Sequence, residues 1–283
     1  MKVQFGVALL LLCVSGGALR AASPWVPEAG RTTATFAYVN DDFRQYRPGK
    51  LHLTLPAPYG QETYFGFLEY GLGKKLSLDV ETGYTKTAFR GNSLDGVTDS
   101  TIGLRYQMKT GERWALTLRG AAVIAGSYNL TRVGNWSPGD GASGGLGSVL
   151  MGWSLPANFF TFLEAGYRVR TNPVPQDAFG SAGVGSSIKR LTWTAVYNTS
   201  RSINGVDIVG TAPRYSAYFQ PSQFPATKKV FDAVDLGVSY RVRDDLSVGF
   251  NYGKIFHGRN VGLKRIYAAS ISYTLPFRLP HFR

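Results

Sequence analysis

The sequence contains one cysteine, Cys13, and it lies close to the N-terminus. The rest of the chain therefore forms no disulfide, cysteine metal site or thiol nucleophile. A chain without cysteine is suited to an oxidising compartment outside the cytoplasm. Histidine is almost as scarce, with only His52, His257 and His281. A lipid hydrolase needs a serine or threonine beside a histidine, and these three lie in predicted loops or in the tail. We therefore expect no enzyme, and His257 beside a loop serine is the remaining alternative.

Charged residues are also few, at 17% against about 25% in soluble domains. No stretch beyond the N-terminus approaches about 18 consecutive apolar residues, so no transmembrane helix is predicted. Insertion into a membrane would then require a closed β-barrel. The formal charge is +13, but the basic residues are scattered over predicted turns and loops. We expect them to face anionic lipid and lipopolysaccharide rather than nucleic acid. The sequence has no phosphate-binding loop, dinucleotide motif or metal-ligand cluster, and we expect no cofactor.

Residues 1–22 have the composition of a secretory signal peptide. Lys2 supplies the positive charge, a short apolar run follows, and small residues lead to Ala21 and Ala22. The apolar run is too short to span a bilayer as a helix, which takes about 20 residues. We expect cleavage after Ala21 or Ala22, which leaves a single domain, residues 23–283.

Apolar and polar residues alternate along most of the remaining chain. In one segment, one face carries Trp114, Leu116, Leu118, Ala122 and Ile124, and the other carries Ala115, Thr117, Arg119, Ala121 and Val123. Side chains of a β-strand point alternately to opposite faces, so such a strand has one apolar face and one mostly small or polar face. Many strands of this kind in tandem are typical of a transmembrane β-barrel. The abundance of Gly, Phe and Tyr, with 34, 17 and 16 copies, agrees with this interpretation.

The pattern predicts an all-β fold, an antiparallel up-and-down barrel of about twelve strands. The predicted strands are 32–40, 62–72, 75–89, 98–108, 113–125, 143–155, 159–171, 177–188, 191–200, 232–242, 245–255 and 264–277. Five connections are tight turns, and the others are mostly longer: 41–61, 90–97, 126–142, 172–176, 201–231 and 256–263. Outer-membrane barrels have short periplasmic turns and longer extracellular loops. The order of the connections therefore predicts that both termini are periplasmic.

Aromatic residues on the predicted lipid face fall into two groups. The predicted periplasmic girdle, beside the short turns, consists of Tyr70, Tyr106, Trp114, Trp153, Trp193 and Tyr240, with Phe159 and Phe277 nearby. The predicted extracellular girdle, toward the long loops, consists of Tyr38, Tyr64, Tyr84, Tyr167, Tyr197, Tyr252 and Tyr267. Trp and Tyr favour the lipid–water boundary, where the ring and the polar tip are both satisfied. The alternative is a soluble β-protein with core aromatics, which gives no reason for two belts.

The opposite strand faces predict a lumen of Ser, Thr, Gly and Asn with some charges. We expect Asp79, Glu81, Arg105 and Arg119 to be neighbours there, and Glu164 to pair with Arg168 within one strand face. All the predicted inward charges are Glu69, Asp79, Glu81, Asp99, Glu164, Asp177 and Asp235 against Arg105, Arg119, Arg168, Arg170 and Arg241. This near balance argues against a strongly anion-selective pore. The cluster is either a constriction that selects solutes or a paired network that satisfies buried polar groups.

Two long loops have alternative roles. The loop 201–231 is rich in aromatic residues and proline, and it either folds into the barrel mouth or projects outward. The loop 41–61 carries Arg44, Arg47 and Lys50, which either contact lipopolysaccharide phosphates or are solvated.

The last predicted strand places Tyr273, Leu275 and Phe277 on one face. This pattern resembles the C-terminal signature that outer-membrane barrels present to their assembly machinery, which makes that machinery a predicted partner. The signature normally ends the chain on its phenylalanine. Further residues follow here, so Phe277 or Phe282 is the equivalent position.

Two stretches resemble a known group of proteins. Residues 68–78, LEYGLGKKLSL, are similar to a hairpin of bacterial "transporter" or phenol-degradation-pathway-like outer-membrane barrels, and residues 98–106, TDSTIGLRY, resemble the strand that follows in them. The resemblance implies passage of small compounds, hydrophobic ones among them, and carries no catalytic residues. Three functions compete: a passive channel or transporter for small molecules, a non-conducting structural or interaction barrel at the cell surface or in polymer export, and a lipid-modifying enzyme. We expect the first.

Overall fold

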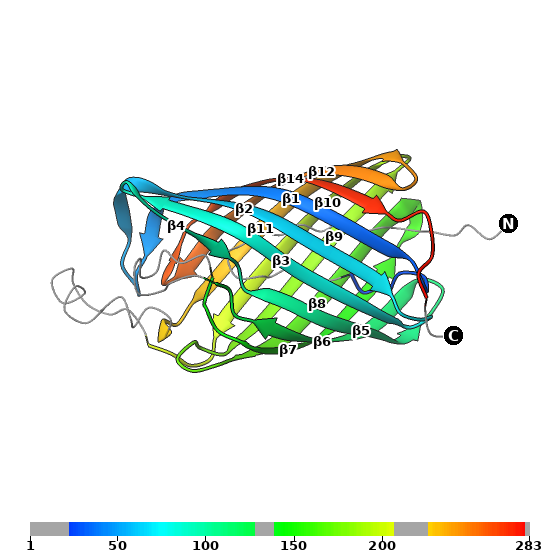
Figure 1. Cartoon of the computed structure of the whole chain (residues 1–283), viewed down its shortest axis with the longest axis horizontal. Helices are drawn as coiled ribbons and strands as arrows, with labels where there is room; N and C mark the ends of the chain where they lie inside the picture. The colour runs from blue at the N-terminus through cyan, green and yellow to red at the C-terminus, as the bar shows by residue number, and fades with distance from the viewer. Residues whose placement is uncertain (1–22, 128–138, 207–225, 281–283) are drawn as a thin grey trace.

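The alternating segments are β-strands that close into one antiparallel barrel (Figure 1). The computed structural model describes residues 23–127, 139–206 and 226–280. The twelve strands of the wall are β1 (Thr32–Arg47), β2 (Leu53–Gly71), β3 (Leu76–Phe89), β5 (Ser100–Thr110), β6 (Trp114–Ile124), β7 (Gly144–Ser154), β8 (Phe159–Arg170), β9 (Asp177–Ile188), β10 (Leu191–Ser202), β11 (Val230–Arg243), β12 (Leu246–Arg259) and β14 (Arg265–Thr274). The barrel closes because β1 pairs with β2 on one side and with β14 on the other. The predicted all-β barrel of twelve strands is therefore confirmed.

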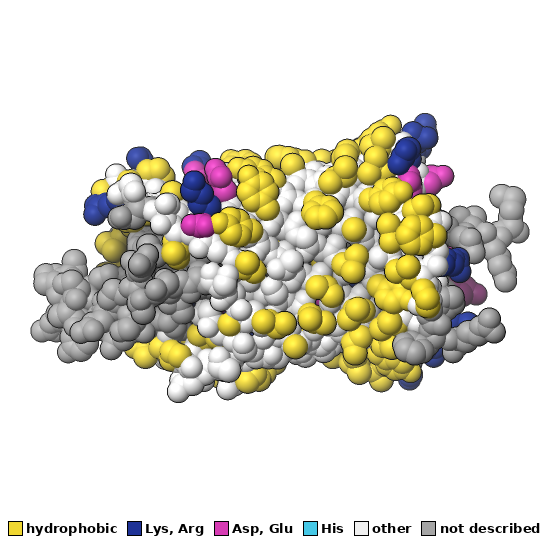
Figure 2. Space-filling model, viewed as in Figure 1, with side chains coloured by type: hydrophobic (Ala, Val, Ile, Leu, Met, Phe, Trp, Pro, Cys, Tyr) yellow, Lys and Arg dark blue, Asp and Glu magenta, His cyan; other side chains and the backbone are white. Residues whose placement is uncertain are grey.

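Burial follows the two-residue period of each strand. On β5 the apolar side chains of Ile102, Leu104 and Tyr106 face outward and are exposed, whereas Thr101 and Arg105 face the lumen and are buried. Such alternation is the expected result when one strand face meets lipid and the other the barrel interior. Figure 2 shows hydrophobic side chains spread over the barrel face between its ends, and charged side chains gathered at the ends.

Several connections contain more strand than predicted. The segment 41–61 is mostly a hairpin, because β1 extends to Arg47 and β2 begins at Leu53. Two short strands, β4 (Asn92–Val97) and β13 (Val261–Gly262), lie in other predicted loops and pair with β3 and β1. The final strand ends at Thr274, three residues earlier than predicted. Strand pairing continues in these places because cross-strand hydrogen bonds satisfy the backbone of a protruding hairpin.

The two ends of the barrel differ in their connections. At one end, called here the short-turn end, tight turns join β2 to β3, β5 to β6, β7 to β8, β9 to β10 and β11 to β12; a 3-10 turn, η2 (Pro156–Asn158), makes the third of these. The longer connections lie at the other end, the long-loop end. Strand β1 begins and β14 finishes at the short-turn end, where Thr33 pairs with Thr274 (Figure 1). Within the described residues, no helix has the length and hydropathy to cross a membrane.

The lumen also contains apolar clusters, which the predicted polar lining did not include. One consists of Phe160, Phe162 and Val196, and a second of Ala37, Val39, Ile266 and Ala268 against Phe65. A third, Phe43, Tyr46 and Tyr59, lies in the protruding part of β1 and β2. The barrel interior is therefore partly a packed apolar core and is not lined by polar residues throughout.

Candidate functional site: the barrel lumen

The chain before β1 enters the barrel. This N-terminal segment, Ser23–Gly30, is anchored near the short-turn end by side chains of the wall. Arg105 donates a hydrogen bond from Nη1 to the carbonyl oxygen of Ser23 at 2.7 Å, and Thr117 donates one to the carbonyl oxygen of Pro24 at 2.5 Å. Gly30 and Gly71 hold the other end of the segment through backbone bonds at the rim. The segment therefore occupies part of the lumen cross-section.

Trp25 fixes the segment against the wall formed by β7, β8 and β10. Its ring packs on the cluster of Phe160, Phe162 and Val196. The neighbouring wall position is Gly152, where a Cβ atom would lie 2.5 Å from the Pro24 ring and 2.7 Å from the Trp25 ring. A side chain there would collide with the segment, so the glycine is what lets it approach the wall. The signal peptide and its cleavage after Ala21 or Ala22 stay predictions, and no pattern in the sequence indicated a role for the residues that follow.

The predicted charged cluster is assembled on the same side of the lumen, around Asp79. Arg105 and Arg119 are direct cross-strand partners, and the Asp79 carboxylate lies 3.6 Å from Arg105 Nε and 2.8 Å from Arg119 Nη2. Glu69, on the strand beside Asp79, contacts Arg105 as well. Arg105 and Asp79 are buried, Arg119 is 9% exposed and Glu69 is 22% exposed. Two adjacent guanidinium groups are tolerated because carboxylates lie between and beside them.

Two further carboxylates surround Arg119. Glu164 accepts a hydrogen bond from Ser148 at 2.7 Å, and both Glu164 and Glu81 act electrostatically on the Arg119 charge. The charged cluster, defined as Glu69, Asp79, Glu81, Arg105, Arg119 and Glu164, is a paired network that also holds the N-terminal segment. Its role in solute selection stays a prediction.

Arg168 does not belong to this cluster, and its predicted pairing with Glu164 is wrong. Arg168 binds Asp177 instead, with Nη2 at 2.7 Å from the carboxylate. Residues four apart on a strand are separated by about 13 Å, at about 3.3 Å per residue. Asp177, in contrast, is the direct partner of Arg168 in the β8–β9 ladder. Cross-strand register, rather than spacing within one strand, decides the pairing.

A second group of charges lies toward the long-loop end, and two of its members, Asp140 and Lys229, were not predicted from the sequence. Arg170 lies 3.0 Å from Asp140 and 3.5 Å from Asp99, and Lys229 also contacts Asp140. Asp140 and Lys229 come from the long connections before β7 and β11, where no period indicated a fixed position. They tie these connections to the barrel wall.

The Asp140 carboxyl is expected to make stability depend on pH. Burial alone raises its pKa, but Lys229 and Arg170 outweigh burial and hold the pKa below its ordinary value. A group whose pKa is lower in the folded state stabilises that state above its unfolded pKa, near 3.8, and less as the pH falls below it. We expect Asp140→Asn to lower the free energy of unfolding by about 1–2 kcal/mol at pH 7. The deficit should shrink at pH 3, measured by urea titration at both pH values. An equal deficit at both would contradict this assignment.

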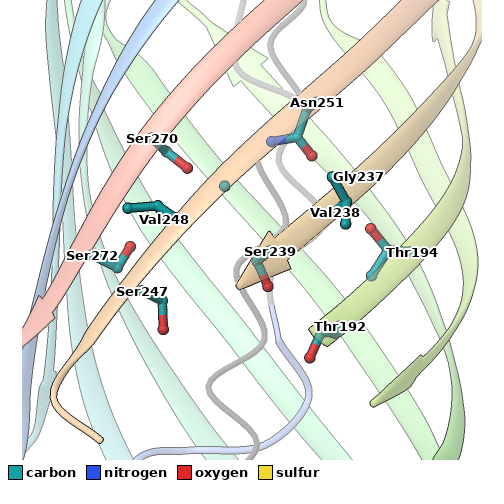
Figure 3. A pocket seen from close by; sticks show the side chains of 11 residues that line it. Thr192, Thr194, Gly237, Val238, Ser239, Ser247, Val248, Asn251, Ser270 and Ser272 are labelled. Carbon is teal, nitrogen blue, oxygen red and sulfur yellow. The ribbon is translucent and has the colours of Figure 1, made fainter. Parts of the chain in front are cut away.

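Near the short-turn end, part of the lumen wall is lined by uncharged residues. Strands β10, β11, β12 and β14 form a groove there that is partly open to solvent (Figure 3). This hydroxyl groove is lined by Thr192, Thr194, Gly237, Val238, Ser239, Ser247, Val248, Gly249, Asn251, Ser270 and Ser272. The predicted lumen of Ser, Thr, Gly and Asn is confirmed on this wall.

His257 lies on β12 and not in the predicted loop. Its Nδ1 atom lies 2.8 Å from Asp232, a carboxylate that also binds Tyr197, Thr199 and Arg201. No serine hydroxyl bonds the His257 ring in the part of the chain that the structure describes. Among the same residues, no group of three or more His, Cys, Asp or Glu side chains is arranged to hold a metal ion. His52 lies in a connection, bonded to Arg47, and His281 lies outside the described residues.

The predicted girdle residues lie on the outward face of the barrel. Six of the seven tyrosines toward the long loops are exposed, and Tyr252 is half-buried against Tyr267. Tyr106, Trp114 and Tyr240 at the other end are also exposed, while Tyr70, Trp153 and Trp193 are half-buried. Their position at a lipid–water boundary stays a prediction. Most of the loop 201–231 lies outside the described residues.

The comparisons with known proteins add to this geometry. No protein family model and no curated protein matches the sequence. The chain is similar in structure to the COG4313 outer membrane channel from Pseudomonas putida F1, with a TM-score of 0.72 at 8% identity over 88% of this chain and 97% of that one. Lower scores relate it to the KdgM porin (0.47, 8% identity, 84% and 98% covered) and the CymD monoaromatic hydrocarbon channel (0.43, 11% identity, 90% of each). The chain therefore has the fold of bacterial outer-membrane barrels.

Proposed function

We propose that this protein is an outer-membrane channel through which small molecules pass by diffusion. The observation that supports this most is the division of the barrel into an apolar outer face and a lumen with an open, uncharged wall. A barrel of this size lies between small barrels, which are filled by side chains, and wide porins. The N-terminal segment narrows the lumen further. The similarity in fold between this protein and an outer-membrane channel agrees with this proposal.

The orientation in the membrane is part of the proposal. The short-turn end faces the periplasm, because outer-membrane barrels place their short turns there. An N-terminal signal peptide would deliver the chain from that side, and the N-terminal segment would then close over the periplasmic half of the lumen. Barrel assembly machinery would receive the region of β14 and Phe277, and lipopolysaccharide would surround the long-loop end.

The test is conductance in planar lipid bilayers. Purified, folded protein is expected to insert and give discrete current steps that persist over a range of voltages. Heat-modified migration on a gel serves as the control for a folded barrel. A folded protein that gives no current at any voltage would contradict the proposal.

A non-conducting structural barrel is the second candidate, and one observation favours it. The N-terminal segment and the lumenal clusters bury much of the interior, including Phe162 and Arg105. The same bilayer measurement separates the two candidates, because only the channel gives current steps.

A further inference from the structure

In the half of the lumen near the short-turn end, the two sides of the barrel differ in solvent accessibility and in charge. On the side of β3 to β8, the inward residues Ser77, Asp79 and Thr117 are at most 2% exposed, because the N-terminal segment and the charged cluster cover them. On the side of β10 to β14, the inward residues Ser239, Ser247 and Ser270 remain partly exposed. Solvent therefore reaches Ser239, Ser247 and Ser270 in the groove, whereas in the charged cluster it reaches mainly Glu69.

The groove has unused hydrogen-bonding capacity. Thr192 bonds Ser187 and Ser272 bonds Thr35, but no side-chain hydrogen bond is found for Thr194, Ser239 or Ser270 within the described parts of the chain. The same holds for Ser247 and for the Asn251 amide. These side chains come from β10, β11, β12 and β14 and line one pocket, which Figure 3 shows from close by. Hydroxyl and amide groups both donate and accept hydrogen bonds, so the groove presents both kinds of partner.

The charges nearest to the groove are few and opposite in sign. Asp235, bonded to Asn198, lies two positions from Gly237 on the same face of β11, deeper in the barrel. Arg241 lies two positions beyond Ser239 in the other direction, beside Ser247 in the ladder. An ion that gave up hydration to enter the groove would find no counter-ion within its lining, which makes entry costly. A neutral solute with several hydroxyl groups exchanges bonds to water for bonds to the groove.

We propose that the hydroxyl groove is the path of permeation and that it selects uncharged solutes bearing several hydroxyl groups. This inference rests on the proposed channel function and names its solute class. The N-terminal segment contributes by covering much of the charged cluster, so that permeating solutes contact the uncharged hydroxyl groove instead.

Swelling of proteoliposomes in three solutes of similar size tests this: glucose, gluconate and glucosamine, which are neutral, anionic and cationic. We expect glucose to give a swelling rate roughly tenfold higher than either ion. The triple variant Ser239→Ala, Ser247→Ala, Ser270→Ala widens the groove yet removes three hydroxyls, and its glucose rate should fall roughly fivefold. The control is Leu236→Ala with Phe250→Ala, two exposed residues on the outward face of the same strands and outside the groove lining, which should leave the rate unchanged.

The outcomes separate the two proposals. Equal rates for glucose and either ion would overturn the solute class while leaving the channel intact. A triple variant with an unchanged or higher glucose rate would show that the hydroxyls do not contact the solute, and would also overturn it. Absence of swelling in all three solutes, together with absence of bilayer current, would overturn the channel and this inference with it.

Discussion

Deletion of Ser23–Pro27 is expected to raise the single-channel conductance severalfold. The deletion removes Trp25 from the cluster of Phe160 and Phe162 and uncovers the charged wall, which enlarges the water-filled cross-section of the lumen. Glu28 remains, with its contact to Arg278 at the rim. Arg105 keeps Glu69 and Asp79 as partners, so the wall should hold its structure. Planar bilayer recordings of the deleted and complete proteins measure the effect.

Single substitutions of Trp25 provide the matched controls. Trp25→Ala should raise conductance less than the deletion, because the side chains of Arg105 and Thr117 still donate hydrogen bonds to the backbone carbonyl groups of the segment. It should also increase current fluctuations, because the segment loses its contact with the apolar cluster. Trp25→Phe keeps an aromatic ring against the cluster and should behave as the parent does. A deletion variant with the parent's conductance would mean that the segment leaves the lumen in the membrane.

Asp79→Ala is expected to lower the free energy of unfolding by about 3–5 kcal/mol, because it leaves Arg105 and Arg119 side by side and buried without the carboxylate between them. Asp79 is 2% exposed, so water cannot replace the missing charge without rearrangement of the wall. Asp79→Asn keeps a hydrogen-bond acceptor and should cost less. Urea titration of the folded barrel, followed by tryptophan fluorescence, gives the comparison.

The control for this prediction is an exposed ion pair in the same protein. Asp245 pairs with Arg243 in a tight turn, where both side chains are solvated. Asp245→Ala should cost less than about 1 kcal/mol, the usual magnitude for exposed pairs. Equal and small losses for both substitutions would show that the charged cluster contributes nothing to stability.

The sequence predicted the strands closely, for a physical reason. Lipid on one face and the barrel interior on the other impose a two-residue period, and that period is visible in any single strand. Segments without such a constraint were predicted less well. The protruding ends of β1 and β2 lie beyond the predicted strands, and the N-terminal segment has no period at all, so neither could be recognised from the pattern.

The sequence by itself determined the barrel: its strand number, the outward apolar face and the inward position of Asp79, Arg105 and Arg119. These properties depend on alternation within each strand and on the order of short and long connections. Only the tertiary structure decided which inward residues meet. Register pairs Arg168 with Asp177, and closure of the barrel brings Ser23 to Arg105 and leaves the hydroxyl groove open. Such contacts join residues far apart in the chain, and a local period holds no information about them.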